Sequence, residues 1–208
     1  FFNEEETLAL ADTEIKTASG TEVIWADLSR MKKGSAELDL EADFNNAVGL
    51  AVDELGMIFH RFLDEREPKS QKIQINVNGR RIEAKDPFCR SNQGTQSLKT
   101  ISETINGETI KFSPFVLPYY SNLSAPEREQ LGGKEGFVKN SGFYIYRQKR
   151  LIIRGTWFKL IPYGELSKLA RIMVDVPNSL DEQWKITVDK SGAQLPPALR
   201  KRLSNWLD

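Results

Sequence analysis

The sequence predicts an α+β protein in which a mixed, largely antiparallel sheet is packed against helices. Two Asn-Gly pairs, at 78–79 and 106–107, each join two strand-like stretches, a pattern typical of tight β-hairpins. Apolar residues recur at helical spacing between residues 44 and 63. The regular alternation of strand and helix that a doubly wound parallel sheet requires is not visible along the chain. We therefore expect antiparallel strands with interspersed helices.

The composition is that of a globular protein with a real core. The chain has 208 residues, of which 39% are hydrophobic and 28% charged, so apolar burial can offset the entropy lost on ordering. Its 29 basic and 29 acidic residues give a formal net charge of zero, which does not support an overall attraction to nucleic acid. The single cysteine, Cys89, fits a reducing compartment. No apolar run approaches the roughly 20 residues of a membrane helix, and no targeting signal is visible. We expect a cytoplasmic protein without membrane contact, and the start at Phe1 predicts a piece cut from a longer polypeptide.

The first third of the chain predicts a strand followed by a long helix. A strand is expected over 21–28, after the Ser19-Gly20 break, and the polar stretch 31–35 is the best candidate for a boundary. One face of a helix of about 20 residues then collects the apolar side chains, because residues three and four apart are neighbours on a helix surface. These residues are Phe44, Val48, Ala51, Val52, Leu55, Ile58, Phe59 and Phe62. His60, Arg61 and Asp64 are expected to face water.

Hairpins and short helices are expected in the remainder. The hairpins run over 73–83, 98–115 and 142–153, the last turning at Gln148-Lys149. Ser124 and Glu127 form a capping-box signature for a short helix that Gly132-Gly133 ends. The other expected elements are a helical stretch over 166–170, strands over 171–176 and 184–188, and a closing helix over 195–207.

The common catalytic constellations cannot be assembled from this chain. His60 is the only histidine, which excludes a histidine metal cluster, and we expect it to be a solvated helix residue. The stretch 132–136 contains glycines and a lysine but lacks the Ser or Thr of a P-loop, so it predicts a loop. Turn chemistry explains Asp86 and the pair Asp181-Glu182, and nothing in the sequence places a second carboxylate opposite either. Cys89 has no evident base.

Three separated segments, read together, resemble a known family. Residues 19–28, with Gly20-Thr21, resemble the strand that ends the nucleotide-binding domain of GHKL ATPases of the MutL and Microrchidia type. Residues 142–152 resemble the hairpin of the following transducer, or middle, domain, in which an aromatic-rich strand turns at a basic tip. Residues 184–191 resemble the strand and loop that deliver a lysine from the transducer to the γ-phosphate of ATP. Order and spacing match, and the three segments span nearly the whole chain.

The resemblance implies a division and a role. Residues 1–33 would be the tail of an upstream GHKL ATPase domain, and residues 34–208 a transducer domain with the ribosomal-protein-like fold also found in related heat-shock chaperones. Lys190 would be the phosphate-contacting lysine, although here Asp189 precedes it directly where MutL-type proteins have a longer His-Pro-Ala stretch. ATP and magnesium are implied for the longer protein, as are an upstream ATPase domain as partner and a homodimer. The GHKL catalytic glutamate, metal-binding asparagine, Asp-x-Gly-x-Gly motif and lid are not found in this chain, so the chain alone is expected to be inactive and to hold no cofactor.

Alternatives remain open for the candidate site residues. Lys190, flanked by Ser191 and Gly192, is either a movable point charge for a terminal phosphate or a solvated turn lysine. The basic tip formed by Arg147, Lys149 and Arg150 is either a contact for a polyanion or partner, or a solvated hairpin end. Two further sets of residues are expected to be structural. The tryptophans are expected to anchor the core, and they are Trp157, Trp184 and Trp206. The basic residues near the end of the last helix are expected to be favoured there by the helix dipole, and they are Arg200, Lys201 and Arg202. The alternative function is a nucleic-acid- or partner-binding α+β module without nucleotide coupling.

Overall fold

The computed structural model describes residues 20–21, 23, 40–66, 68, 72–180, 184–185 and 194–207. The chain divides into two compact units, residues 1–50 and 51–208, and each is described by itself. The described part of the first unit consists of Gly20, Thr21, Val23 and the beginning of a helix from Leu40. Most of the predicted strand over 21–28 and the predicted boundary at 31–35 lie outside the described residues. The division into 1–33 and 34–208 stays a prediction.

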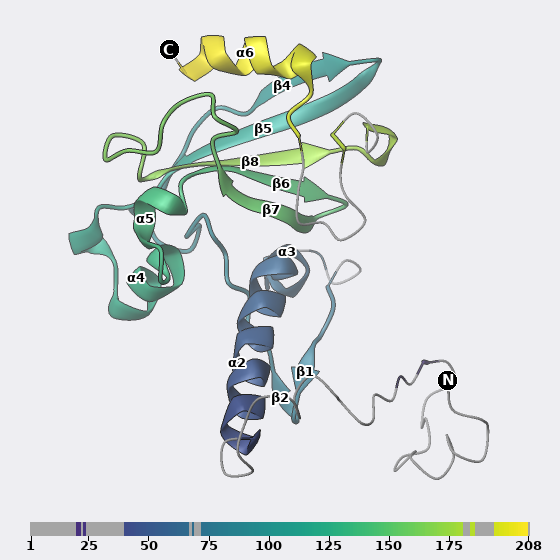
Figure 1. The fold of residues 1–208 in the computed structure, drawn as a ribbon, viewed down its shortest axis with the longest axis vertical. Helices are drawn as coiled ribbons and strands as arrows, with labels where there is room; N and C mark the ends of the chain where they lie inside the picture. Colours follow the sequence, from purple (N-terminus) through teal and green to yellow (C-terminus); the bar gives the residue numbers. More distant parts are fainter. Residues whose placement is uncertain are drawn as a thin grey trace. The chain divides into compact units, whose positions relative to one another are not determined.

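The described elements confirm the α+β class (Figure 1). The α-helices are α2 (Leu40–Ile58), α3 (His60–Leu63), α4 (Ala125–Gly132), α5 (Gly136–Lys139) and α6 (Pro197–Leu207). The strands are β1 (Asn76–Val77), β2 (Arg80–Arg81), β3 (Gln96–Ser97), β4 (Ile101–Ile105), β5 (Glu108–Val116), β6 (Gly142–Arg147), β7 (Arg150–Thr156) and β8 (Ala170–Val176). Short 3-10 turns lie at Tyr120–Asn122 and Asn178–Leu180.

The main sheet is mixed and largely antiparallel, as predicted. Its six strands follow the order β3-β5-β8-β6-β7, with β4 paired to β5. The pairing of β6 with β8 is parallel, whereas the other strand pairs in this sheet are antiparallel. The strands β1 and β2 form a separate two-stranded hairpin. The parallel pair places β6 and β8 side by side at the centre of the sheet.

The predicted hairpin turns form where expected. Asn78 and Gly79 have φ of 50° and 75°, and Asn106 and Gly107 have φ of 51° and 83°. A type I′ turn needs positive φ at both central residues, which asparagine and glycine tolerate best. The turn between β6 and β7 also has positive φ at Gln148–Lys149, 50° and 65°, although neither residue is glycine.

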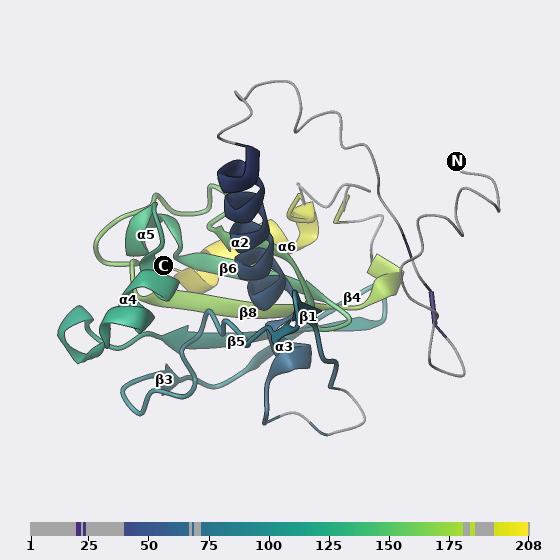
Figure 2. The ribbon, with the colours of Figure 1, turned by 90° about the horizontal axis from the view of Figure 1, so that it is seen from below.

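Helix α6 lies on one side of the main sheet and α3 on the other (Figure 2). Successive residues of β6 belong to two different clusters of buried side chains, because neighbouring residues of a strand point to opposite faces. Phe143 and Ile145 join a cluster that includes Leu199 of α6. Tyr144 and Tyr146 join a second cluster beside Phe88 and Met57. Helices α6 and α3 thus lie on opposite sides of the sheet in both ribbon views. Each large apolar side chain buried in this way contributes about 1.5 to 3 kcal/mol to stability.

Local signals set the ends of α4, as predicted. The Ser124 hydroxyl accepts a hydrogen bond from the Glu127 backbone N–H, and the Glu127 carboxylate accepts one from the Ser124 N–H. Gly133, with φ of 52°, ends the helix. The glycine-rich stretch 132–136 is therefore a helix end, a short loop and the start of α5, in agreement with the loop prediction.

Three secondary-structure predictions need correction. The long helix is interrupted at Phe59, whose φ of −103° and ψ of 14° separate α2 from α3. The expected helical stretch over 166–170 is a turn that leads into β8. Trp184 and Lys185 lie in a turn, and the rest of the strand predicted over 184–188 lies outside the described residues. In each case tertiary packing overrides a weak local preference.

Candidate functional site

The structure brings the three residues of the basic tip together at one end of the β6–β7 hairpin. Arg147 and Arg150 are register partners, and Lys149 lies in the turn between them. All three side chains are half-buried. The Arg150 guanidinium lies 5.5 Å from the centroid of the Phe59 ring, within the range of a cation–π contact. The tip therefore packs against the junction between α2 and α3.

Lys190 lies outside the described residues, but both ends of the segment that carries it are described. Trp184 is fully buried, and its backbone N–H donates to the Leu180 carbonyl at 3.1 Å. Its ring centroid lies 6.4 Å from that of Phe158. The Gln194 N–H donates to the Trp184 carbonyl at 2.9 Å. The segment between 184 and 194 thus starts and ends at one anchored point of the core.

The structure corrects the expectation that His60 faces water, because His60 is fully buried. Its Nε2 atom lies 2.7 Å from the Tyr146 hydroxyl, and its Nδ1 atom lies 3.8 Å from Oδ1 of Asp86. Burial lowers the pKa of His60 to about 3, helped by the positive charges of Arg90 and Arg61 and opposed by Asp86. The break at Phe59 separates α3 from α2, so the apolar spacing of the longer helix does not predict the orientation of His60. Tyr146 supplies the hydrogen bond that a buried imidazole needs.

The same region brings together two carboxylates, which corrects the expectation that Asp86 has none opposite it. Asp64, expected to face water, is buried. The Arg66 Nη2 donates to Asp64 at 2.7 Å and to Asp86 at 3.0 Å. Arg90 donates through Nε to Asp86 at 2.8 Å and through Nη2 to Asp64 at 3.1 Å. Turn chemistry is also present, since Asp86 accepts the Phe88 N–H at 3.1 Å.

This arginine–aspartate network keeps its carboxylates ionised. Burial raises the pKa of Asp86, but Arg90 and the other partners outweigh it and hold that pKa below its ordinary value. Burial also opposes ionisation of Asp64, and hydrogen bonds from Arg66 again leave the pKa lowered. A neutral imidazole beside two permanently charged carboxylates is poorly suited to general acid catalysis near neutral pH. We therefore assign the network a structural role, which is to hold the end of α3 against the 86–90 loop.

Separate contacts of Arg61 on α3 and Glu54 on α2 reach three strands of the sheet. The Arg61 guanidinium lies 5.0 Å from the Tyr146 ring centroid on β6 and forms an ion pair with Asp175 on β8. Arg154 on β7 pairs with Glu54 on α2 at 2.8 Å. A displacement of α3 would therefore be passed to the centre of the sheet through polar contacts with fixed geometry.

A buried cation, Arg171 on β8, was not anticipated from the sequence. Its guanidinium donates to the Pro87 carbonyl at 2.6 Å and to the Leu131 carbonyl at 2.5 Å. It also lies 5.5 Å from the Tyr144 ring centroid. Arg171 thus ties the 86–90 loop and the end of α4 to the sheet, and burial lowers its pKa.

Other residues singled out in the sequence have structural roles. Cys89 is buried, and burial together with Glu127 raises the pKa of its thiol to about 11, which makes the thiolate rare at neutral pH. The tryptophans at 157 and 184 are buried, and Trp206 packs edge-to-face on Phe112, confirming the core prediction. On α6, Arg202 pairs with Glu103, and Arg200 donates to the Phe158 carbonyl at 3.3 Å.

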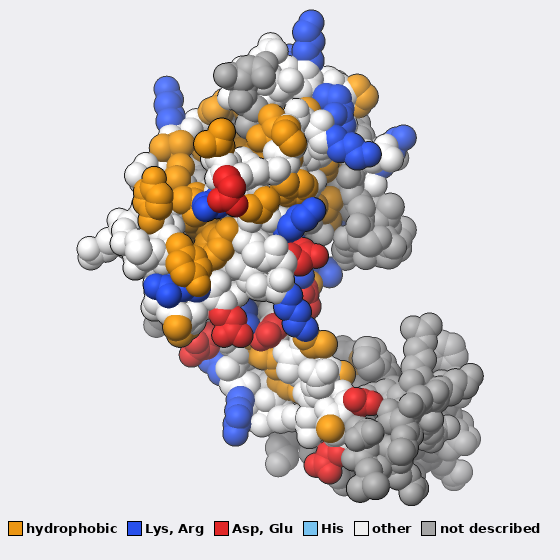
Figure 3. Space-filling model, turned by 60° about the vertical axis from the view of Figure 1, so that its left-hand side comes forward, with side chains coloured by type: hydrophobic (Ala, Val, Ile, Leu, Met, Phe, Trp, Pro, Cys, Tyr) orange, Lys and Arg blue, Asp and Glu red, His pale blue; other side chains and the backbone are white. Residues whose placement is uncertain are grey.

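The surface and the comparisons add little that identifies the site. On the face drawn in Figure 3, basic and acidic side chains are interspersed, in keeping with their equal numbers in the sequence. Among the described residues there is no group of three His, Cys, Asp or Glu side chains placed to hold a metal ion. Within the same part of the chain, no helix is long and apolar enough to cross a membrane. Comparison with family models, with curated proteins and with solved structures finds no match.

Proposed function

We propose that this chain is the transducer region of a GHKL-type ATP-binding protein, coupling the nucleotide state of an upstream ATPase domain to a conformational change or dimer closure. The observation that carries the proposal is the anchoring of the segment between Trp184 and Gln194. Its two ends are joined by a 2.9 Å backbone hydrogen bond on a fully buried tryptophan. On this proposal, Lys190, which lies in the sequence between these two described ends, contacts a phosphate from outside the domain.

The chemistry of Lys190 fits this role. An ammonium is a compact point charge with three donors, suited to a terminal phosphate that approaches from another domain. If Lys190 contacts the phosphate in only one arrangement of the two domains, the free energy of that contact stabilises this arrangement relative to the others. Binding of the nucleotide then shifts the population toward it. ATP, magnesium and a cytoplasmic location belong to the same proposal, the last because the lone Cys89 is a buried free thiol.

The contacts around α3 support the second half of the proposal, the transmission of motion. Phe59 contacts Arg150 of the hairpin tip through a cation–π contact, His60 forms a hydrogen bond with Tyr146 of β6, and Arg61 forms a second cation–π contact with Tyr146. Directional contacts therefore link the end of the helix to the central strands. A displacement of the helix is passed on to the strands through these contacts and is not taken up by side-chain rearrangement.

The test is ATP turnover by the longer polypeptide that includes the proposed ATPase domain. Lys190→Ala should lower turnover about 10- to 150-fold, because a charge-assisted hydrogen bond made chiefly in the transition state is worth about 1.5 to 3 kcal/mol. Lys185→Asn is the matched control, since Lys185 is exposed and has a φ of 44°, which asparagine tolerates. The control should leave turnover nearly unchanged.

Equal and small effects of the two substitutions would refute the role of Lys190. Circular dichroism of both variants checks that the domain remains folded. Loss of nucleic-acid or partner binding in an Arg150→Ala variant, with ATP turnover absent from the longer protein, would instead favour the module without nucleotide coupling.

A further inference from the structure

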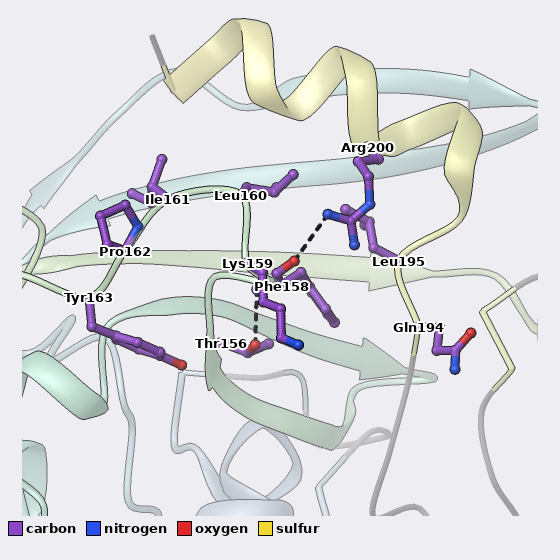
Figure 4. Close-up of a pocket in the computed structure, with 10 residues that line it drawn as sticks. All are labelled: Thr156, Phe158, Lys159, Leu160, Ile161, Pro162, Tyr163, Gln194, Leu195 and Arg200. Carbon is purple, nitrogen blue, oxygen red and sulfur yellow. Dashed lines mark hydrogen bonds between the residues drawn. The ribbon is translucent and has the colours of Figure 1, made fainter.

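A groove lies between the loop that follows β7 and the N-terminal half of α6. It consists of a hollow of about 790 Å³, lined by residues of 156–163 together with Gln194, Leu195 and Arg200 (Figure 4). A second hollow of about 430 Å³ continues along α6 as far as Asn205 and shares Lys159, Leu160 and Arg200 with the first. We call the two together the α6 groove. None of the contacts described above for α3 or the hairpin tip involves it.

The charged side chains among the described residues of the α6 groove are all basic. Lys159, Arg200 and Lys201 line it and are exposed, and none of the other described lining residues is Asp or Glu. Within the described part of the chain, Lys159 and Lys201 have no ion pair. In a chain with zero net charge this is a local excess of positive charge, and it selects an anionic occupant.

The backbone of the loop holds one of these charges in place. Phe158 and Lys159 have φ of 51° and 60°, a conformation that bulky residues seldom adopt. It is held by three hydrogen bonds: Phe158 N–H to the Thr156 hydroxyl at 3.0 Å, Leu160 N–H to the Trp157 carbonyl at 2.9 Å, and Arg200 to the Phe158 carbonyl at 3.3 Å. Figure 4 shows Lys159 and Arg200 on either side of the Phe158 carbonyl. The loop and α6 therefore bring Lys159 and Arg200 to the same groove.

The uncharged lining is mainly aliphatic, with Leu160, Ile161, Pro162 and Leu195. Its two aromatic rings are already engaged. Phe158 lies 6.0 Å from Phe143 and 6.4 Å from Trp184, centroid to centroid, and Lys139 lies 5.2 Å from the Tyr163 ring. Single-stranded nucleic acid is usually held by bases stacked on free aromatic faces. The aliphatic lining instead fits an aliphatic side chain.

The length of the groove fits a short stretch of chain. From Pro197 to Asn205 the axis of α6 advances about 12 Å, at about 1.5 Å per residue. An extended peptide covers that distance with about four residues. We propose that the α6 groove binds an acidic peptide segment of a partner protein, with its carboxylates at Lys159, Arg200 and Lys201 and one aliphatic side chain against Leu160 and Ile161. The described residues on which this proposal rests do not include Lys190.

The test is fluorescence anisotropy of a labelled peptide, Glu-Glu-Leu-Glu-Glu, titrated with the present chain. Reversal of two exposed cations in Lys159→Glu/Lys201→Glu should weaken binding by about tenfold or more, because two attractive pairs become repulsive. Lys134→Glu is the matched control on the exposed loop after α4, and it should change the affinity less than about twofold. Raising the salt from about 50 to about 500 mM should weaken binding to the unmodified chain.

Two further peptides test the chemistry. If charge selects the occupant, Gln-Gln-Leu-Gln-Gln should bind much more weakly than Glu-Glu-Leu-Glu-Glu. If the aliphatic lining also selects the occupant, Glu-Glu-Ser-Glu-Glu should bind more weakly than Glu-Glu-Leu-Glu-Glu. Equal affinity for all three peptides, or no effect of the double reversal, would overturn the proposal. So would tighter binding of a single-stranded oligonucleotide that displaces the acidic peptide. Lys190→Ala should leave peptide affinity unchanged, so the outcome is separable from that of the ATPase experiment.

Discussion

The buried histidine makes a sharp prediction about stability and pH. His60 is the only histidine of the chain and is held neutral in the folded state, with its pKa lowered to about 3 by burial. The groups that face it are Arg61 from α3, Asp64 directly after α3, Asp86 and Arg90 from the 86–90 loop, and Tyr146 from β6. In the unfolded chain its pKa returns to about 6.5, so unfolding takes up a proton at any pH between the two values.

The direction and size of the effect follow from this difference. A lowered folded pKa means that the unfolded state binds more protons, so stability is complete above about pH 7 and is lost as the pH falls through 6.5 toward 3. Between pH 7.5 and 5 the expected loss is about 2 kcal/mol, from RT ln(1 + 10^(pKa − pH)) with the unfolded pKa. Asp64 and Asp86 contribute little in this range, because their pKa values are lowered from an ordinary value that already lies below pH 5.

The variant His60→Gln isolates this contribution. Glutamine can donate a hydrogen bond to the Tyr146 hydroxyl but takes up no proton in this range. Urea unfolding at pH 7.5 and pH 5 should show the loss of about 2 kcal/mol in the unmodified chain and a much smaller change in the variant. An equal loss in both proteins would refute the assignment, since the proton uptake would then come from other groups.

Three further predictions concern other parts of the molecule. Arg90→Met should lower the free energy of unfolding by about 1 to 3 kcal/mol in urea titrations at pH 7, because the buried Asp86 then keeps only Arg66 and backbone N–H groups as donors; a change below about 0.5 kcal/mol would contradict the network. Cys89 should react with a disulfide reagent at pH 8 at least tenfold more slowly in the folded than in urea-unfolded chain, because a pKa of about 11 leaves about one thiol in a thousand ionised; equal rates would mean the thiol is accessible. The chain alone should show no heat of binding when titrated calorimetrically with ATP and magnesium, and stoichiometric micromolar binding would overturn the proposed domain assignment.

Much of the fold could be predicted because its signals are local. The Asn-Gly turns, the capping box at Ser124 and the double proline at the start of α6 act on residues within a turn or two of themselves, and all are present in the structure. Periodicity located the helix in the 44–63 region but missed its interruption at Phe59. That break depends on what α3 packs against, which the spacing of apolar residues does not report.

The sequence by itself determined the α+β class and the hairpins, since these follow from turn chemistry and periodicity. Only the tertiary structure decided that His60 is buried against Tyr146, 86 residues away, and that Arg66 and Arg90 join Asp64 to Asp86. It also decided that β6 pairs in parallel with β8, and that a loop after β7 meets α6 to form a basic groove. The physical reason is that burial and charge pairing are properties of neighbours in space. A residue's own type and spacing set what it can do, and the packed surroundings set its protonation state and its partners.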